Sequence, residues 1–221
     1  MTIRKRVGSV MFIAAAAAAV VGMSVGPALA STTLTVKVSH GGSYTATAKT
    51  TVLTDKTKDG PLSVTCVTKG KTPSSKGTGK MSGTHRGKAP VSLGKVNNLS
   101  FKNCSGELGP VTTTVKATPT LNADSKTNSK GETDGIITGV KVDVSMTDCS
   151  FTVTGSAPGY YSNKTHTLTM TSKLPVKALT KAELTISDVP KGSCAGLITD
   201  GQHPTYSASY KVSKNITIKS S

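Results

Sequence analysis

Apolar residues alternate with polar ones along most of the chain after residue 31. Leu34, Val36 and Val38 alternate with threonine, lysine and serine, and the run from Val140 to Met146 alternates in the same way. A period of two residues places the apolar side chains on one face of a half-buried strand. The 3.6-residue period of an amphipathic helix is not sustained, and its nearest approach is one helical turn at 180–184. The pattern therefore predicts a chain built almost entirely from strands.

Turn-forming sequences separate these alternating runs. His40-Gly-Gly-Ser43 and Gly106–Pro110 are two examples, and the strands between such turns are rich in threonine and valine. Many short strands with regular turns are typical of a sandwich or a barrel. We expect an all-β fold, either an antiparallel β-sandwich or a barrel-like sheet. The polar stretch 122–134 would connect two similar halves, residues 31–121 and 135–221, which form either one domain or two.

Residues 1–30 have the three parts of a secretory signal peptide. Arg4, Lys5 and Arg6 form a positive start, residues 10–21 are an unbroken apolar run, and Ala28-Leu-Ala30 matches a cleavage site. The apolar run is too short for a transmembrane helix, which needs about 20 apolar residues. We therefore expect cleavage after Ala30 and a mature domain, residues 31–221, that is secreted to an extracellular or wall-associated location.

All four cysteines lie in the expected mature domain. An even number of cysteines in an exported chain indicates disulfide bonds, and four cysteines allow three pairings. We expect Cys66–Cys104 and Cys149–Cys194, because each bond then encloses one strand-rich half. A zinc site is the alternative, but no two cysteines have the close spacing of zinc ligands. We expect neither a metal site nor a cofactor.

At the cysteines and several turns, the chain resembles uncharacterised exported proteins of actinobacteria that have a signal peptide and a β-rich mature domain with two disulfides. The resemblance rests on four stretches, Gly41–Thr47, Phe101–Cys104, Asn163–Leu168 and Cys194–Ile198, and it spans most of the mature chain. It implies export and a β-rich, disulfide-bonded fold. The family has no assigned activity, so the resemblance implies no catalytic residue.

The chain is strongly basic, with 27 Lys and Arg residues against 11 Asp and Glu residues. Loss of residues 1–30 removes three basic and no acidic residues, which leaves a formal net charge of +13. Basic residues gather in 69–88, where Gly, Ser and Thr fill the gaps between them. This segment has too little apolar content to bury, so we expect a loop or a hairpin with a mobile tip. The candidate anion-binding residues are Lys69, Lys71, Lys76, Lys80, Arg86 and Lys88.

A basic domain attracts polyanions within a Debye length of about 8 Å at physiological ionic strength. Outside a bacterial cell, such partners are anionic wall polymers and membrane surfaces. Aromatic residues make up 4% of the chain and tryptophan is absent, which argues against stacking platforms for carbohydrates or specific nucleic acids. The alternative is that the lysines only keep the loops soluble. We expect a non-enzymatic domain that attaches to anionic cell-envelope polymers; the sequence does not indicate its oligomeric state.

A secreted hydrolase with an unrecognised active site is the alternative function. Ser193, Asp200 and His203 lie near one another in the chain, but no Gly-x-Ser-x-Gly elbow supports a nucleophile. His203 follows Asp200-Gly201 and is explained more simply by a turn. We therefore expect no catalytic residues.

Three further groups of residues have candidate roles. Asp124, Glu132 and Asp134 carry oxygen ligands that suit calcium, but they lack the Asp-x-Asp-x-Asp-Gly pattern of a calcium loop. We expect His166 on a buried strand face. Tyr160 and Tyr161 lie in a Gly- and Pro-containing stretch, 155–163, that we expect to be a loop, where they would contact a ligand or the edge of the sheet.

Overall fold

The computed structural model describes residues 33–57, 60–172, 174 and 182–221. The expected signal peptide lies outside this part of the chain, and so do the first two residues of the helical turn considered at 180–184. Its last three residues are not helical, and Leu184 is in a strand. Within the described residues, no helix has the length and apolar character needed to cross a membrane.

The expected all-β fold is confirmed, because the described residues form one antiparallel sheet of 13 strands. The alternating sequences form these strands as expected: Leu34, Val36 and Val38 are buried, and the residues between them are more exposed. The elements in chain order are β1 (Thr33–Thr57), β2 (Gly60–Val67), β3 (Ser75–Lys88), β4 (Val91–Phe101), β5 (Cys104–Gly106), β6 (Gly109–Val115), β7 (Thr120–Ala123), β8 (Glu132–Met146), β9 (Cys149–Ser162), β10 (Thr167–Met170), β11 (Leu184–Ser187), the 3-10 helix η2 (Cys194–Gly196), β12 (Thr205–Val212) and β13 (Thr217–Ser220).

Several strands of the sheet lie end to end and pair with the same neighbouring strand. The sheet therefore has fewer strand positions than strands. For example, Val67 of β2 pairs with Thr50 of β1, and Ser75 of β3 pairs with Ala48, so β2 and β3 continue one line. The same relation joins β5 to β4, β6 to β7, β10 to β11 and β12 to β13. We call each such line a column. The strands fill eight columns, each antiparallel to the next.

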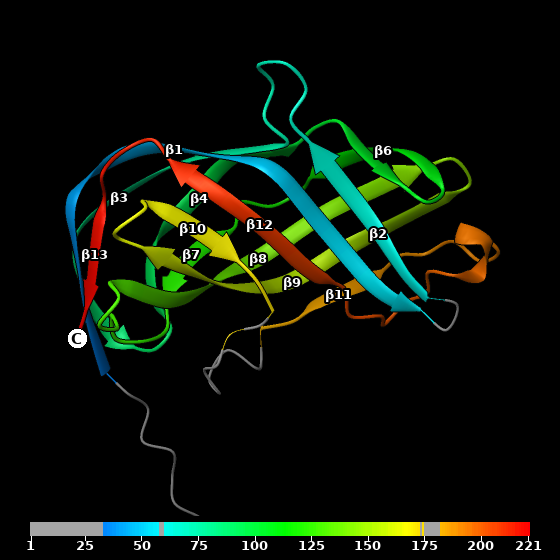
Figure 1. The fold of residues 1–221 in the computed structure, drawn as a ribbon. Helices are drawn as coiled ribbons and strands as arrows, with labels where there is room; N and C mark the ends of the chain where they lie inside the picture. The colour runs from blue at the N-terminus through cyan, green and yellow to red at the C-terminus, as the bar shows by residue number, and fades with distance from the viewer. Residues whose placement is uncertain (1–32, 58–59, 173, 175–181) are drawn as a thin grey trace, which may run out of the picture. The chain divides into compact units, whose positions relative to one another are not determined.

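The eight columns close into a ring (Figure 1). The last column returns to the first, since Val212 of β12 pairs with Ala46 of β1 and Ile218 of β13 pairs with Val38. Of the two expected alternatives, the chain therefore adopts the barrel-like sheet. Residues 33–123 supply the first four columns and residues 132–220 supply the other four, and β8 joins the two sets by pairing with β6, β7 and β9.

The buried apolar side chains of all eight columns form one cluster. Leu34 of β1, Val144 of β8 and Ile186 of β11 are three of its members, and each is at most 5% exposed. Full burial of such a side chain stabilises the fold by about 1.5–3 kcal/mol. Strand β9 runs on to Ser162, so the expectation of a loop at 155–163 is wrong for nearly all of that stretch. Its Gly155, Pro158 and Gly159 lie within the strand.

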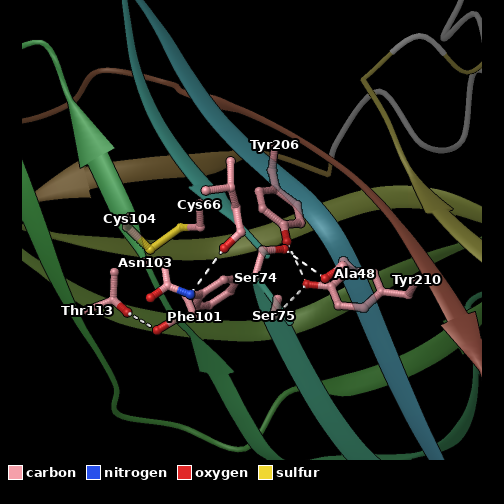
Figure 2. The surroundings of a disulfide bond; sticks show 11 residues. Ala48, Cys66, Ser74, Ser75, Phe101, Asn103, Cys104, Thr113, Tyr206 and Tyr210 are labelled. Carbon is pink, nitrogen blue, oxygen red and sulfur yellow. Dashed lines mark hydrogen bonds between the residues drawn. A yellow bond between two sulfur atoms is a disulfide. The ribbon is translucent and has the colours of Figure 1, made fainter. Parts of the chain in front are cut away.

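Both expected disulfides are present, Cys66–Cys104 and Cys149–Cys194. Cys66 of β2 and Cys104 of β5 are paired residues on neighbouring strands, and the side chain of Asn103 donates a hydrogen bond to the Val67 carbonyl beside them (Figure 2). The second bond joins the start of β9 to η2. Disulfides form and persist in oxidising compartments, so the two bonds indicate an environment outside the cytoplasm.

Candidate functional site

Residues 75–88 of the basic segment form strand β3, so the expectation of a loop is wrong for this part. β3 pairs with β1 along one edge and with β4 along the other, which agrees with the alternative of a hairpin. Gly77, Gly79 and Met81 are buried, and Lys76 and Lys80 are exposed between and beside them. Glycine occupies inward positions of β3, so the strand lacks the alternation of large apolar and polar residues by which strands are recognised in a sequence.

Glycine occupies these inward positions because neighbouring groups approach the backbone too closely to leave room for a side chain. A Cβ atom at position 79 would lie 2.5 Å from the Tyr44 hydroxyl oxygen and 2.7 Å from the Lys95 carbonyl oxygen. Cβ atoms in proteins do not approach other heavy atoms so closely. The inward positions of β3 are therefore shaped by packing, and its lysines are held on the outside of a rigid strand.

The other part of the basic segment, Thr68–Ser74, is a loop that projects from the sheet between β2 and β3 (Figure 1). Its tip is fixed by two backbone hydrogen bonds of 3.0 and 3.1 Å between Lys69 and Thr72. At its base, the Ser74 hydroxyl donates to the Ala48 carbonyl over 2.9 Å. Lys69 and Lys71 are exposed on this loop.

The ring brings further basic residues beside β3. Lys211 and Lys219 come from the last column, Lys37 and Lys49 from β1, and Lys95 from β4. All are exposed. We define the basic face as the exposed basic side chains on β3, β4, β12, β13 and residues 33–54 of β1: Lys37, Lys49, Lys76, Lys80, Arg86, Lys88, Lys95, Lys211 and Lys219.

Two lysines of the basic face stand directly opposite each other, since Lys37 of β1 pairs with Lys219 of β13. Arg86 is close to this pair, because it pairs with Thr35, two residues from Lys37 on the same strand. Like charges in directly opposed positions of an antiparallel pair destabilise the sheet. An anion bound at this point would relieve the repulsion.

No acidic side chain lies in the strand segments that carry this charge. Residues 33–54, 75–101 and 205–221 contain no Asp or Glu. Among the described residues, the ion pairs lie elsewhere: Lys116 Nζ is 3.2 Å from Asp143 Oδ2, and His203 is paired with Glu183. The basic face therefore presents uncompensated positive charge over four neighbouring columns.

The geometry of the basic face suits an extended polyanion. Side chains on one face of a strand repeat about every 6.5–7 Å, and neighbouring strands lie about 4.8 Å apart. Lysine is a strongly hydrated point charge that binds phosphate or carboxylate without a bidentate arrangement. The basic face is therefore a grid of positive charges with these spacings.

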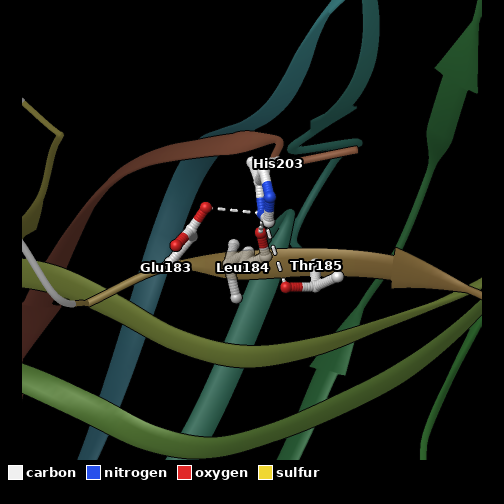
Figure 3. A network of polar contacts seen from close by, with 4 residues as sticks. All are labelled: Glu183, Leu184, Thr185 and His203. Carbon is white, nitrogen blue, oxygen red and sulfur yellow. Dashed lines mark hydrogen bonds and ion pairs between the residues drawn. The ribbon is translucent and has the colours of Figure 1, made fainter. Parts of the chain in front are cut away.

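The candidate hydrolase residues are not joined to one another by any hydrogen bond in the described part of the chain. His203 Nδ1 lies 2.6 Å from Glu183 Oε1, 3.2 Å from the Leu184 carbonyl and 3.5 Å from the Thr185 hydroxyl (Figure 3). Asp200 instead accepts a hydrogen bond from the Val189 amide, and the Ser193 hydroxyl points to Cys194 Sγ.

The contacts of His203 do not form a relay from a hydroxyl to a carboxylate. A triad histidine contacts the carboxylate through one ring nitrogen and the nucleophile through the other. Here Glu183, Leu184 and Thr185 all approach the same nitrogen, Nδ1. This arrangement fixes the imidazole against the start of β11 and does not activate Thr185.

The side chains of His166 and Tyr161 contact each other and the Ile216 carbonyl, close to the start of β13. His166 lies in the turn before β10 with a positive φ of 51°, so its expected place on a strand face is wrong. Tyr161 is buried and donates a hydrogen bond of 2.7 Å to the Ile216 carbonyl. These contacts hold the segment between β12 and β13 in place.

The acidic residues considered for calcium lie at the connection between β7 and β8. The Asp124 amide donates to the Asp134 carbonyl over 2.9 Å. Burial raises the pKa of both side-chain carboxyls, and the neighbouring charges of Glu132 and Asp124 raise the pKa of Asp134 further. The structure shows no group of three or more His, Cys, Asp or Glu side chains in the described ranges that is suited to hold a metal ion.

Sequence reasoning missed Lys37, Lys211 and Lys219 as members of the basic face. They are far from residues 69–88 in the chain. Pairing of β1 with β3 places Lys37 beside β3, and closure of the ring places Lys211 and Lys219 beside β1. The signal in the sequence was the absence of acidic residues from 33–54 and 205–221.

Comparison with known proteins adds no relatives: no family model, no curated protein and no solved structure matches this chain.

Proposed function

We propose that this protein is an exported, non-enzymatic domain that attaches to an anionic polymer or membrane surface of the cell envelope through its basic face. The observation that carries the proposal is the run of exposed basic side chains over four neighbouring columns, in strand segments (33–54, 75–101 and 205–220) that contain no acidic residue. Export is supported by the signal-like sequence of residues 1–30 and by the two disulfides. Each Lys or Arg near an anionic surface contributes about 1 kcal/mol to binding.

The proposal is tested by comparing two variants with the same net charge. The face variant changes four residues of the basic face to glutamine, and the control variant changes four exposed lysines outside the basic face. The face variant carries Lys37→Gln, Lys80→Gln, Arg86→Gln and Lys219→Gln, and the control carries Lys56→Gln, Lys141→Gln, Lys164→Gln and Lys191→Gln.

Binding of both variants to purified cell wall, anionic vesicles and heparin is measured from low to high salt. We expect the face variant to lose affinity by at least about tenfold at low salt and the control to remain within about threefold of the wild type. The difference between the variants should disappear at high salt, where counterion release no longer favours binding. Equal losses in the two variants would show that only net charge matters and would refute the basic face as the site.

A further inference from the structure

The ring encloses a cavity of about 150 Å³. Its walls come from all eight columns and are almost wholly apolar; Leu93, Leu99, Val142, Val153 and Leu168 are among the side chains that line it. An eight-stranded ring is at the size where the interior either fills with side chains or holds one small ligand. An engineered apolar cavity of similar volume stays dry and binds benzene.

The cavity exists because inward positions carry small side chains. Ala46 of β1 and Ala157 of β9 both line it. Leu53, Leu99 and Leu168 also line it and are only partly buried, although they belong to the sheet's apolar interior. Larger side chains at Ala46 and Ala157 would fill part of this space, so the chain leaves a volume that a more densely packed core would not have.

One polar group in the cavity wall lacks a partner. Tyr44 is 5% exposed, and no group in the described part of the protein forms a hydrogen bond with its hydroxyl. Burial raises the pKa of Tyr44 to about 12, so the phenol stays protonated and can donate a hydrogen bond. A buried donor without an acceptor costs free energy, which an acceptor on a bound molecule would recover.

The other phenols differ from Tyr44. The hydroxyls of Tyr206 and Tyr210 are 2.6 Å apart, and that of Tyr210 is 2.8 Å from the Ser75 hydroxyl (Figure 2). Phe101 packs edge-on against Tyr206, with ring centroids 6.2 Å apart. The hydroxyls of Tyr206 and Tyr210 therefore have partners, whereas the Tyr44 hydroxyl is buried without one in the described part of the chain.

The residues that line the cavity also disfavour charged ligands. It contains no Lys, Arg or His among the described residues, and Asp134 is the carboxylate that borders it. A carboxylate ligand would thus lose its hydration without gaining a cation. We propose that the cavity binds a neutral apolar molecule of about the size of benzene that offers one hydrogen-bond acceptor to the Tyr44 hydroxyl. This site is separate from the basic face and does not depend on the proposed attachment.

Three molecules of similar size separate the parts of this proposal. Acetophenone has an aromatic ring and a neutral acceptor, ethylbenzene has the ring alone, and benzoate is charged. Binding to the mature, disulfide-bonded chain is measured by calorimetry and by ligand-detected NMR. We expect acetophenone to bind more tightly than ethylbenzene by about three- to tenfold, the range that one net hydrogen bond supplies, and benzoate to bind at least about a hundredfold more weakly.

Two phenylalanine variants test the role of the hydroxyl. Tyr44→Phe should reduce the preference for acetophenone over ethylbenzene to about one and should fold at least as well as the wild type, because it removes a group without a partner. Tyr206→Phe is the matched control: it removes a paired hydroxyl from the same lining and should leave the preference unchanged.

Substitutions that fill the cavity should abolish the binding of both acetophenone and ethylbenzene. Ala46→Leu and Ala157→Leu each add a bulky side chain to the lining, and either variant that retains its near-ultraviolet circular dichroism should bind neither acetophenone nor ethylbenzene. The proposal would be overturned if acetophenone fails to bind the wild type up to its solubility limit, if benzoate binds as well, or if Tyr44→Phe keeps the preference for acetophenone.

Discussion

At the scale of single residues, the absence of a side chain at position 79 lets β3 approach Tyr44. Gly79 pairs with Tyr44 across the strands, and the tyrosine ring covers the space above the glycine. Gly87 lies on the same strand but is different, because a Cβ there would meet only Val91 Cγ2 at 4.0 Å. Neither glycine has a positive φ, so the effect of a substitution at either position depends on packing and not on backbone strain.

These two glycines give a matched pair of substitutions. We expect Gly79→Ala to destabilise the fold by about 1–3 kcal/mol, because the new methyl overlaps backbone and phenol atoms. Gly87→Ala should be neutral or stabilise the protein by up to about 1 kcal/mol, because it restricts the unfolded chain. Urea unfolding of the disulfide-bonded protein measures both. A Gly79→Ala variant as stable as wild type would contradict the close packing described here.

At the scale of elements, the strands with large apolar residues could be predicted from the sequence, and those with glycine inside could not. The alternation of Leu34, Val36 and Val38 predicts the start of β1 correctly. The turn expected at His40–Ser43 is wrong, because these residues lie inside β1, at a shift in its pairing with β3. β3 and the second part of β9 were assigned to loops, because Gly77, Gly79 and Gly159 stand at inward positions. In these strands the neighbouring side chains supply the apolar contacts, and this information is absent from the local sequence.

Asp124, in the connection between β7 and β8, destabilises the folded state by an amount that depends on pH. One carboxylate oxygen of Asp124 is buried without a partner in the described structure, and burial raises the pKa of the group. A carboxyl whose pKa is higher in the folded state binds its proton more tightly there, so its contribution to stability improves as the pH falls and worsens as the pH rises through the folded pKa. At neutral pH the ionised group therefore destabilises the fold.

Asp124→Asn should remove this cost. We expect the variant to be more stable than wild type at pH 7, and the difference to shrink as the pH falls and to vanish near pH 3, where Asp124 is protonated in both folded and unfolded chains. Unfolding midpoints measured in urea at several pH values provide the test. An equal difference at pH 7 and pH 3 would mean that the substitution acts through packing and not through charge.

At the scale of the whole molecule, the disulfide pairing followed from the order of the cysteines, but the closed ring did not follow from the sequence. Each disulfide joins residues within one half of the chain, so the spacing was informative. Closure depends on pairing between β1 and β12 or β13, which no local pattern encodes. Four members of the basic face, Lys76, Lys80, Arg86 and Lys88, could be named from the sequence. Lys211 and Lys219 could not, because closure of the ring brings them beside β1.

Removal of either disulfide should destabilise the whole fold. The bonds span sequence separations of 38 and 45 residues, and the chain-entropy model assigns about 4 kcal/mol to a loop of this length. We expect similar losses for the pair Cys66→Ala with Cys104→Ala and for the pair Cys149→Ala with Cys194→Ala. Equilibrium unfolding in urea measures each loss, and an unchanged free energy of unfolding in either double variant would contradict the expectation.

The pairing of β1 with β12 and β13 also has a consequence for how the chain reaches its folded state. β1 is the first strand to be synthesised, and the partners along one of its edges are the last. The amino-terminal end of a nascent chain leaves the ribosome first. One edge of β1 therefore stays unpaired until residues 205–220 have been synthesised. Folds dominated by such distant contacts form in milliseconds to seconds, slowly compared with helical domains. During that interval, the lysines of β1 would oppose association of the open edge with other chains.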